Sequence, residues 1–219
     1  VMPRIIDVLL SILALLILLP LFVPIVIVLL LTGEHKVFYS QTRVGLKNQN
    51  FKIIKFATML SNSANMGSGS LTLKNDPRVL PFGSVLRKTK INELPQILNI
   101  IIGDLAIVGP RPQMRVDFEK YSEEVQKNIY NVRPGLTGIG SIIFRDEESL
   151  ISAASVNENP HDFYKRVIAP YKGELEMWYQ EKRSLILDVQ LIFMTAWTIV
   201  VPETRLYDKW FKDLPKRNF

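Results

Sequence analysis

The longest apolar run of the chain lies near its start. Between residues 8 and 31 no side chain is charged, and Ser11 is the only ordinary polar residue. The run exceeds the roughly 18 apolar residues that indicate a membrane segment. It is also longer than the apolar region of a signal peptide, and no small-residue cleavage site follows it. The pattern therefore predicts a helix that enters a lipid bilayer and is retained.

Two prolines and the flanking charges indicate how this helix enters the bilayer. Pro20 and Pro24 each remove a helix hydrogen bond, and each ring collides with the preceding turn, so a straight helix is disfavoured. Basic residues occur at position 4 before the run and at positions 36, 43 and 47 after it. Positive charge on both sides suits a segment that enters and leaves by the cytoplasmic face. A kinked helix that crosses once is the alternative left open.

The polar part of the chain begins with two short strand patterns. They are VFYSQTRVG and FKIIKFATM, within residues 37–59, and the turn-rich residues 45–50 join them. This arrangement predicts a β-hairpin. Residues 61–70 are small and polar and include two glycines, so we expect a mobile loop that could act as a lid.

A short helix is predicted between residues 92 and 102. Asn92 is a natural N-cap, Glu93 favours the positive end of a helix, and Pro95 falls in the first turn, where a missing N–H costs little. Apolar residues recur at helical spacing as far as Ile102, and Gly103 suits a left-handed C-cap.

An acid and an arginine flanked by prolines follow this helix. Asp104 precedes an apolar, strand-like run that ends in GPRP, the motif of Arg111. The prolines hold the backbone extended and fix the direction of the guanidinium, which suits a phosphate. Together with Glu93 these residues look like an active site, although each one alone fits a core helix and a turn equally well.

The second half of the chain is mainly helical by its pattern. Residues 113–131 predict an amphipathic helix. Residues 160–183 have a helical pattern with many charges, interrupted around Pro170 and Gly173. The run RPGLTGIG from Arg133 resembles a phosphate nest, and a plain glycine turn is its alternative. Residues 184–201 are apolar except for Asp188, which favours a buried or membrane-surface helix over a spanning one. The basic, aromatic tail is typical of an interfacial anchor.

Composition narrows the class of protein. A length of 219 residues suits one domain with an attached segment, and 27 basic against 21 acidic residues favour an anionic partner. The absence of cysteine excludes a disulfide scaffold, a zinc–cysteine site and a thiol nucleophile, and two histidines argue against a histidine metal centre. Any metal would use oxygen ligands. No nucleic-acid-binding module is recognisable, which argues against that class of partner.

Five motifs, taken in order, resemble the bacterial sugar transferase family, which comprises monotopic polyprenyl-phosphate phosphoglycosyl transferases. They are RIID at the start of the apolar run, FKIIKF, ELPQ, GD followed by GPRP, and RPGLTG, and they cover nearly the whole chain. The resemblance implies an α+β fold with a re-entrant membrane helix hairpin, over residues 1–36. It also implies a small cytoplasmic catalytic domain over residues 37–201, to which we add an interfacial tail over residues 202–219.

The activity that the resemblance implies is transfer of a phosphosugar from a nucleotide diphosphate sugar, such as a UDP-sugar, to polyprenyl phosphate with Mg²⁺. Its products are a polyprenyl-diphosphate sugar and UMP, in the first membrane step of glycoconjugate or polysaccharide assembly. The expected location is the cytoplasmic face of the bacterial inner membrane, in contact with membrane lipids, and a homodimer is left open. A membrane-anchored scaffold is the alternative, and it would need no convergent acids and arginines.

Site residues follow from the motifs and their physical roles. Mg²⁺ prefers oxygen ligands, and the candidates are Glu93 and Asp104. The candidates for binding the diphosphate and nucleotide are basic, namely Lys55, Arg87, Arg111 and Arg133. Three residues of the apolar segment are candidates for positioning it or the lipid phosphate: Arg4, Asp7 and Pro20.

One position departs from the pattern of the family. Asn92 stands where the family has the Asp of an Asp–Glu pair, and the resemblance implies that this Asp attacks the sugar-linked phosphate. An amide has no anionic oxygen to offer as a nucleophile. Three hypotheses follow for Asn92 and Glu93 as the catalytic pair. Glu93 has become the nucleophile, or the two substrates react directly in a ternary complex, or the protein is inactive.

Overall fold

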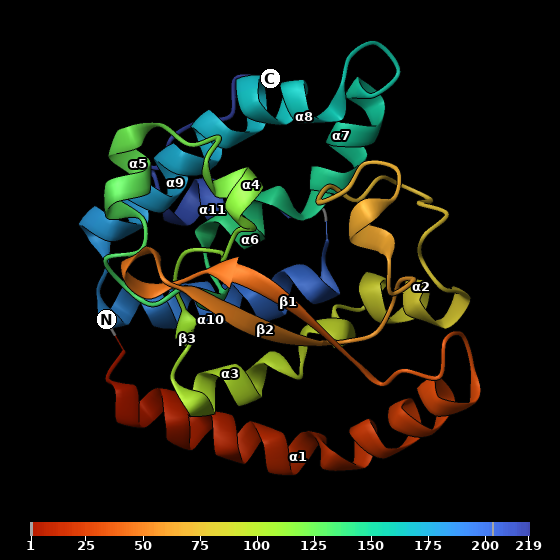
Figure 1. The fold of residues 1–219 in the computed structure, drawn as a ribbon. Coiled ribbons are helices and arrows are strands. Elements are labelled where there is room, and N and C mark those ends of the chain that lie inside the picture. Colours follow the sequence, from red (N-terminus) through yellow and green to blue (C-terminus); the bar gives the residue numbers. More distant parts are fainter. Residues whose placement is uncertain (1, 203) are drawn as a thin grey trace.

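The fold begins with one long apolar helix, α1 (Arg4–Leu31), in a computed structural model that describes residues 2–202 and 204–219. Pro20 and Pro24 lie inside this helix. The helix stays continuous through both prolines, rather than ending at them, and its second half turns back toward the rest of the molecule (Figure 1). A bend of this kind relieves the clash of a proline ring without breaking the helix.

The outer face of α1 is apolar and lacks a protein partner over most of its length. Its exposed side chains include Ile5, Leu9, Leu13, Leu16, Ile17, Val23, Ile27 and Leu31. Among the described residues, α1 is the one helix long and apolar enough to cross a membrane. An apolar surface of this extent indicates contact with lipid or with another apolar partner.

Both ends of α1 are fastened to the same body of the protein. Near its start, Arg4 Nη1 donates to the carbonyl oxygen of Leu105 at 3.1 Å, and Nη2 donates to that of Ile100. Asp7 Oδ1 accepts from the backbone N–H of Ile107 at 3.2 Å. Near its end, Ile25 and Leu29 of α1 form a buried cluster with Phe56 and Leu86.

The predicted β-hairpin is confirmed. Strands β1 (Phe38–Val44) and β2 (Asn50–Phe56) pair antiparallel from Phe38 opposite Phe56 to Val44 opposite Asn50. The 3₁₀ turn η1 (Leu46–Asn48) joins them. A second, smaller sheet pairs β3 (Ala106–Val108) with β4 (Gly135–Thr137) in parallel.

The glycines after Arg133 allow two backbones to pack closely. A Cβ added at Gly135 or Gly138 would collide with the backbone of Gly109, which follows β3. Glycine is the residue that permits such a close approach of two backbones. This packing explains the glycines by the plain structural alternative, and the phosphate nest stays a prediction.

Along the chain between β2 and β3 come α2 (Pro81–Lys88), the 3₁₀ turn η3 (Ile91–Glu93) and α3 (Gln96–Ile102). Helix α2 rests directly on the backbone of Thr58, because Leu80 N–H donates to its carbonyl at 2.9 Å and a Cβ on Gly83 would collide with the same oxygen. The predicted left-handed cap at Gly103 is confirmed, with φ of 114°.

The C-terminal half packs helices around the main core, most of them above the hairpin in Figure 1, with α10 behind it. The elements are α4 (Arg115–Phe118), α5 (Glu123–Asn128), α6 (Ile139–Ile143), η4 (Phe144–Asp146), α7 (Glu147–Ala154), α8 (Pro160–Phe163), the π-turn η5 (Tyr164–Ile168), α9 (Ala169–Lys182), α10 (Leu185–Val200) and α11 (Leu206–Trp210). A single helix over residues 113–131 is wrong: the chain turns after α4, and Ser122 caps α5 by accepting from Val125 N–H.

Helix α10 is buried along one face and exposed along the other. Its acid, Asp188, is buried and accepts from the hydroxyl of Tyr179 at 2.8 Å and from the backbone N–H of Met2 at 2.7 Å. In the tail, Trp210 stacks on Phe193 of α10, whereas Phe211 is buried against Trp178. Part of the predicted interfacial tail therefore belongs to the core.

Candidate active site

A cavity of about 680 Å³ opens between β2, α2, η3 and the helices α6, α7 and α9. It brings together five of the residues singled out from the sequence: Lys55, Arg87, Asn92, Glu93 and Arg111. They come from β2, from α2, from η3 and from the GPRP loop, so four separate segments converge on it.

Glu93 is the centre of a cationic cluster in this cavity. Its Oε1 accepts from Lys55 Nζ at 3.1 Å and from Arg111 Nη2 at 3.2 Å. Burial by itself would raise the pKa of Glu93, but the charges of Lys55, Arg111 and Lys90 outweigh it and hold the pKa well below its usual value. The carboxylate is therefore ionised at neutral pH and is surrounded by positive charge.

Lys55 shows the other side of the same balance. Burial, together with the nearby charges of Arg43 and Arg111, lowers its pKa to about 8, against the attraction of Glu93. Several cations thus share one carboxylate, which leaves the cluster with excess positive charge and makes it suitable for a phosphate.

Asn92 is not the N-cap that the sequence predicts. It lies inside η3, and α3 begins four residues later with Pro95 at its cap position. The side chain is buried, with 5% exposed, and its Oδ1 has no hydrogen-bond partner. A buried amide oxygen without a hydrogen-bond partner is energetically costly. The Oδ1 of Asn92 is therefore available at the wall of the cavity to bind a donor or a cation.

The backbone of the GPRP loop is fixed from two sides. Proline has no N–H, so Arg111 and Gln113 carry the N–H groups that follow Gly109 in this loop. Arg111 N–H donates to Glu176 Oε1 at 3.2 Å, and Gln113 N–H donates to the hydroxyl of Tyr130 at 2.9 Å. The same hydroxyl donates to the Arg111 carbonyl at 2.8 Å.

Glu176 itself is buried in α9, with 1% exposed. Burial raises its pKa to about 7, and the Arg111 N–H and the charges of Lys172 and Arg111 only partly offset it. The predicted rigidity of Arg111 thus depends on two buried side chains, Glu176 and Tyr130, that belong to no motif visible in the sequence.

Arg87 lies at the end of α2 and reaches across the cavity. Its Nη2 pairs with Glu148 of α7, and its Nη1 contacts Met59 Sδ at 3.7 Å. Lys88 and Lys90 line the same cavity beside it.

Two predicted site residues lie elsewhere. Asp104 and Arg133 do not line the cavity: Asp104 Oδ2 accepts from Asn99 at 3.2 Å, and Arg133 Nε donates to the Gly103 carbonyl at 2.9 Å. Glu93 precedes α3 and Asp104 follows it, so the two acids lie at opposite ends of a seven-residue helix that is about 10 Å long. The structure does not bring Asp104 to Glu93 as a second metal ligand.

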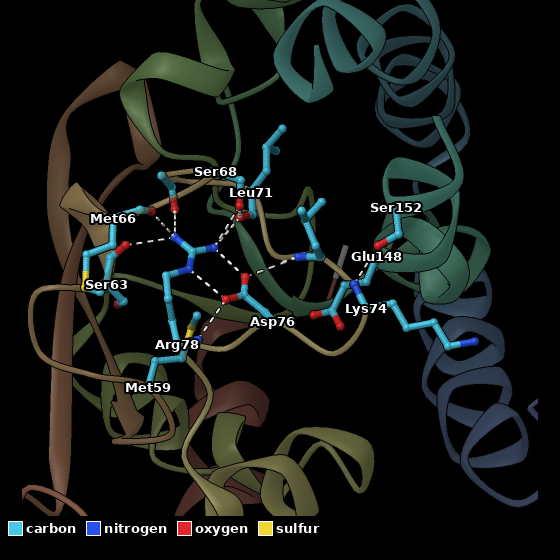
Figure 2. Close-up of polar contacts among 12 residues, drawn as sticks. Met59, Ser63, Met66, Ser68, Leu71, Lys74, Asp76, Arg78, Glu148 and Ser152 are labelled. Carbon is cyan, nitrogen blue, oxygen red and sulfur yellow. Dashed lines mark hydrogen bonds and ion pairs between the residues drawn. The ribbon is translucent and has the colours of Figure 1, made fainter. Parts of the chain in front are cut away.

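The cavity is also lined by the segment between β2 and α2, residues 57–80, which contains the loop 61–70 that the sequence predicts to be mobile. A buried arginine of this segment, Arg78, follows the predicted loop, and Figure 2 shows its guanidinium surrounded by oxygens of the segment. It donates to the carbonyls of Ser63, Met66 and Gly69, each at 2.8 Å, and pairs with Asp76 at 2.6 Å.

These contacts hold the backbone of the loop around the guanidinium of Arg78. The segment also docks on α7, because Lys74 N–H donates to Ser152 Oγ at 2.6 Å (Figure 2). An arginine two residues after an aspartate in a polar stretch is too common a pattern to have revealed this network.

Comparison with known proteins identifies the family. The model of the bacterial sugar transferase family matches residues 1–202. The chain belongs to the bacterial sugar transferase family. As a member it is an enzyme of the sugar transferase class, and its bent apolar helix is in keeping with association with a membrane.

Several relatives of this bacterial sugar transferase carry curated names. The exopolysaccharide production protein ExoY of Sinorhizobium fredii is 34% identical, over 86% of this chain and 81% of that protein. A UDP-N-acetylgalactosamine-undecaprenyl-phosphate N-acetylgalactosaminephosphotransferase of Aeromonas hydrophila is 33% identical over 87% of the chain. An undecaprenyl-phosphate glucose phosphotransferase of Komagataeibacter xylinus is 29% identical over 88% of the chain. The chain spans 42% and 34% of the length of these last two.

Proposed function

We propose that the protein transfers a phosphosugar from a UDP-sugar to a polyprenyl phosphate, such as undecaprenyl phosphate, and releases UMP. The observation that carries this proposal is the cationic cluster around Glu93, which lies in a cavity of the same domain that binds the apolar helix α1. Such a cavity suits the phosphates of a soluble donor, and the helix suits a lipid acceptor. The names of the Aeromonas and Komagataeibacter relatives support the choice of acceptor.

The membrane geometry that fits this function is re-entrant. A straight helix of the length of α1 would extend about 42 Å, enough to cross a bilayer. Its two ends instead bind one domain, through Arg4 and Asp7 at the start and Leu29 near the end. We therefore place both ends of α1 at the cytoplasmic face of the inner membrane, with Pro20 near the bend.

This placement is testable because the chain has no cysteine. Single cysteines introduced as Pro3→Cys and Lys36→Cys should both react with a membrane-impermeant maleimide only after the cytoplasmic side is opened. Labelling of one of them in intact spheroplasts would mean that α1 crosses the membrane.

The residues present fit a Mg²⁺ ion that is shared with the donor. Among the described residues, no group of three or more His, Cys, Asp or Glu side chains could hold a metal by itself. Asn92 Oδ1 lacks a partner, and both cations on Glu93 approach its Oε1, so Asn92 Oδ1 and Glu93 Oε2 are left as ligands. Mg²⁺ commonly takes one or two protein oxygens and completes its shell with phosphates and water. When bound, it would neutralise charge on the diphosphate.

We favour direct transfer between the two substrates. The amide of Asn92 cannot attack phosphorus, and Glu93 is a weak nucleophile because two cations bind its ionised carboxylate. In the step proposed, an oxygen of the lipid phosphate forms a bond to the phosphorus that carries the sugar. The bond from that phosphorus to the bridging oxygen breaks, and UMP leaves with this oxygen and its electron pair. Lys55 and Arg111 stabilise the negative charge during transfer.

The deciding experiment is a UMP-release assay with a panel of UDP-sugars, run on this protein and on Asn92→Asp. We expect the native chain to release UMP only when both polyprenyl phosphate and Mg²⁺ are present. Asn92→Asp, which restores an anionic oxygen, should release one equivalent of UMP without acceptor and carry a phosphosugar adduct detectable by mass spectrometry.

Other outcomes would overturn parts of the proposal. An adduct on Glu93 in the native chain would replace direct transfer by a covalent route. Activity in Asn92→Asp alone, with none in the native chain for any donor, would make this protein a catalytically inactive, membrane-anchored member of its family.

A further inference from the structure

A second hollow of about 220 Å³ adjoins the cavity, on the side of α1. Its interior is formed by apolar side chains from three segments, with Leu29 from α1, Ala57 after β2, and Leu80 and Phe82 at the start of α2. The lining also includes two charged side chains, Glu34 and Lys36, and both bind Ser61. Lys36 Nζ donates to Ser61 Oγ at 2.7 Å, and Glu34 Oε2 accepts from Ser61 N–H.

The two hollows are neighbours with a common border. Met59, Leu80 and Pro81 line both of them. Met59 marks the change in character, because its sulfur contacts the guanidinium of Arg87 in the cavity while its side chain also borders the apolar hollow.

Helix α2 links the two hollows along one face. Pro81, Ser84, Arg87 and Lys88 all line the cavity, at the spacing of a single helix face. Over about 12 Å, the length of eight helical residues, this face changes from apolar at Pro81 to basic at Lys88. A ligand lying along it would meet cations at one end and a mainly apolar hollow at the other.

We propose that the apolar hollow binds the isoprene units nearest the phosphate of the polyprenyl phosphate acceptor, with the phosphate itself near Arg87, Lys88 and Lys90. This inference rests on the proposed function and adds to it a position and direction for the acceptor. The occupant must carry an anionic head and an apolar chain, because a wholly polar ligand would leave the hollow empty and a neutral lipid would bring no negative charge to Lys88 and Lys90. The hollow borders the end of α1, whose outer face is apolar, so the rest of the chain can continue into lipid.

The first test is photolabelling, which needs no turnover. The full-length protein in nanodiscs is irradiated with a polyprenyl phosphate that carries a diazirine on its first isoprene unit, and tryptic peptides are analysed. Trypsin cleaves after Lys55, Lys74, Arg78 and Arg87, so label in the hollow should appear on the peptide of residues 79–87 or on that of residues 56–74. Label confined to the exposed faces of α1 and α10, or competed equally by phosphatidylglycerol, would overturn the proposal.

The second test fills the hollow. Thr32 lines it and caps the end of α1, where a larger side chain can be accommodated without disturbing the core. Thr32→Trp should raise the KM for a long polyprenyl phosphate about tenfold, the value of one or two buried methylene groups, with the KM for the UDP-sugar unchanged. Val85→Trp is the matched control, because Val85 is exposed on α2 and lines neither hollow. An unchanged acceptor KM in Thr32→Trp would count against the site.

The two tests separate this inference from the proposed function. If the native protein releases no UMP with any donor, the proposed function fails, and photolabelling still decides whether the hollow binds the lipid phosphate. If turnover is normal but the label lies elsewhere, only the position of the acceptor is wrong.

Discussion

The two ends of α3 carry similar residues and do different work. Before the helix, Glu93 binds Lys55 and Arg111 inside the cavity. After it, Asp104 binds Asn99, and Arg133 binds the carbonyl of Gly103. At this second end Arg4 also donates to the last carbonyls of α3 and so fastens the apolar helix α1. An acid with nearby arginines thus belongs to the proposed reaction site at one end and to a structural joint at the other.

Removing the acid at each end gives the sharpest contrast. Glu93→Gln should lower kcat/KM for UMP release by about 10³-fold, the loss typical of an electrostatic group aimed at the reacting centre. Asp104→Asn keeps an oxygen that can accept from Asn99, so it should stay within about twofold of the native value. Equal losses in the two variants, measured on folded protein of matched melting temperature, would end the distinction between the two ends.

The pH dependence of stability tests the support behind Arg111. The pKa of Glu176 is raised to about 7 from an ordinary 4.5, so the folded protein binds more protons than the unfolded chain between these values. Stability from this group is therefore full below pH 4.5 and is lost as the pH rises to about 7, by about 3 kcal/mol.

Glu176→Gln serves as the matched variant for this pH dependence. It keeps an oxygen that accepts from Arg111 N–H but does not titrate, so its unfolding free energy should fall less between pH 5 and pH 8 than that of the native protein. Parallel curves for the two proteins in thermal or denaturant melts would show that the Glu176 carboxyl is not titrating as described.

The smallest expected effect comes from exchanging the arginines. Arg111→Lys keeps the charge but loses the planar fork that reaches Glu93 and Ser141, so we expect about a 30-fold loss of kcat/KM. Arg133→Lys, at the structural end, should cost about twofold or less. The ratio of the two losses, rather than either alone, measures how far the ends of α3 differ in function.

Local patterns predicted the elements better than they predicted the site. The apolar run, the hairpin and the cap at Gly103 follow from spacing and composition, because each depends on neighbours in sequence. The turn at Asn92 does not follow from spacing and composition. Asn92 is a good N-cap residue, but it lies in a 3₁₀ turn, and α3 begins only after Pro95.

For the site, sequence reasoning found Lys55, Glu93 and Arg111 but assigned Asp104 and Arg133 to the same place. Adjacency along the chain could not reveal that α3 separates them. The buried Glu176 and the Arg78 network were also missed, because their partners lie far away in sequence or are backbone carbonyls that leave no trace in residue types.

The contact between Gly83 and the carbonyl of Thr58 sets a limit on how this protein can be redesigned. No side chain fits at that point, so α2 can pack in only one position against the backbone of Thr58, just after β2. This position fixes the distance between the basic residues of α2 and Glu93. Changes of lipid preference should therefore come from side chains that border the apolar hollow, such as Thr32 or Phe82, while position 83 stays closed to variation.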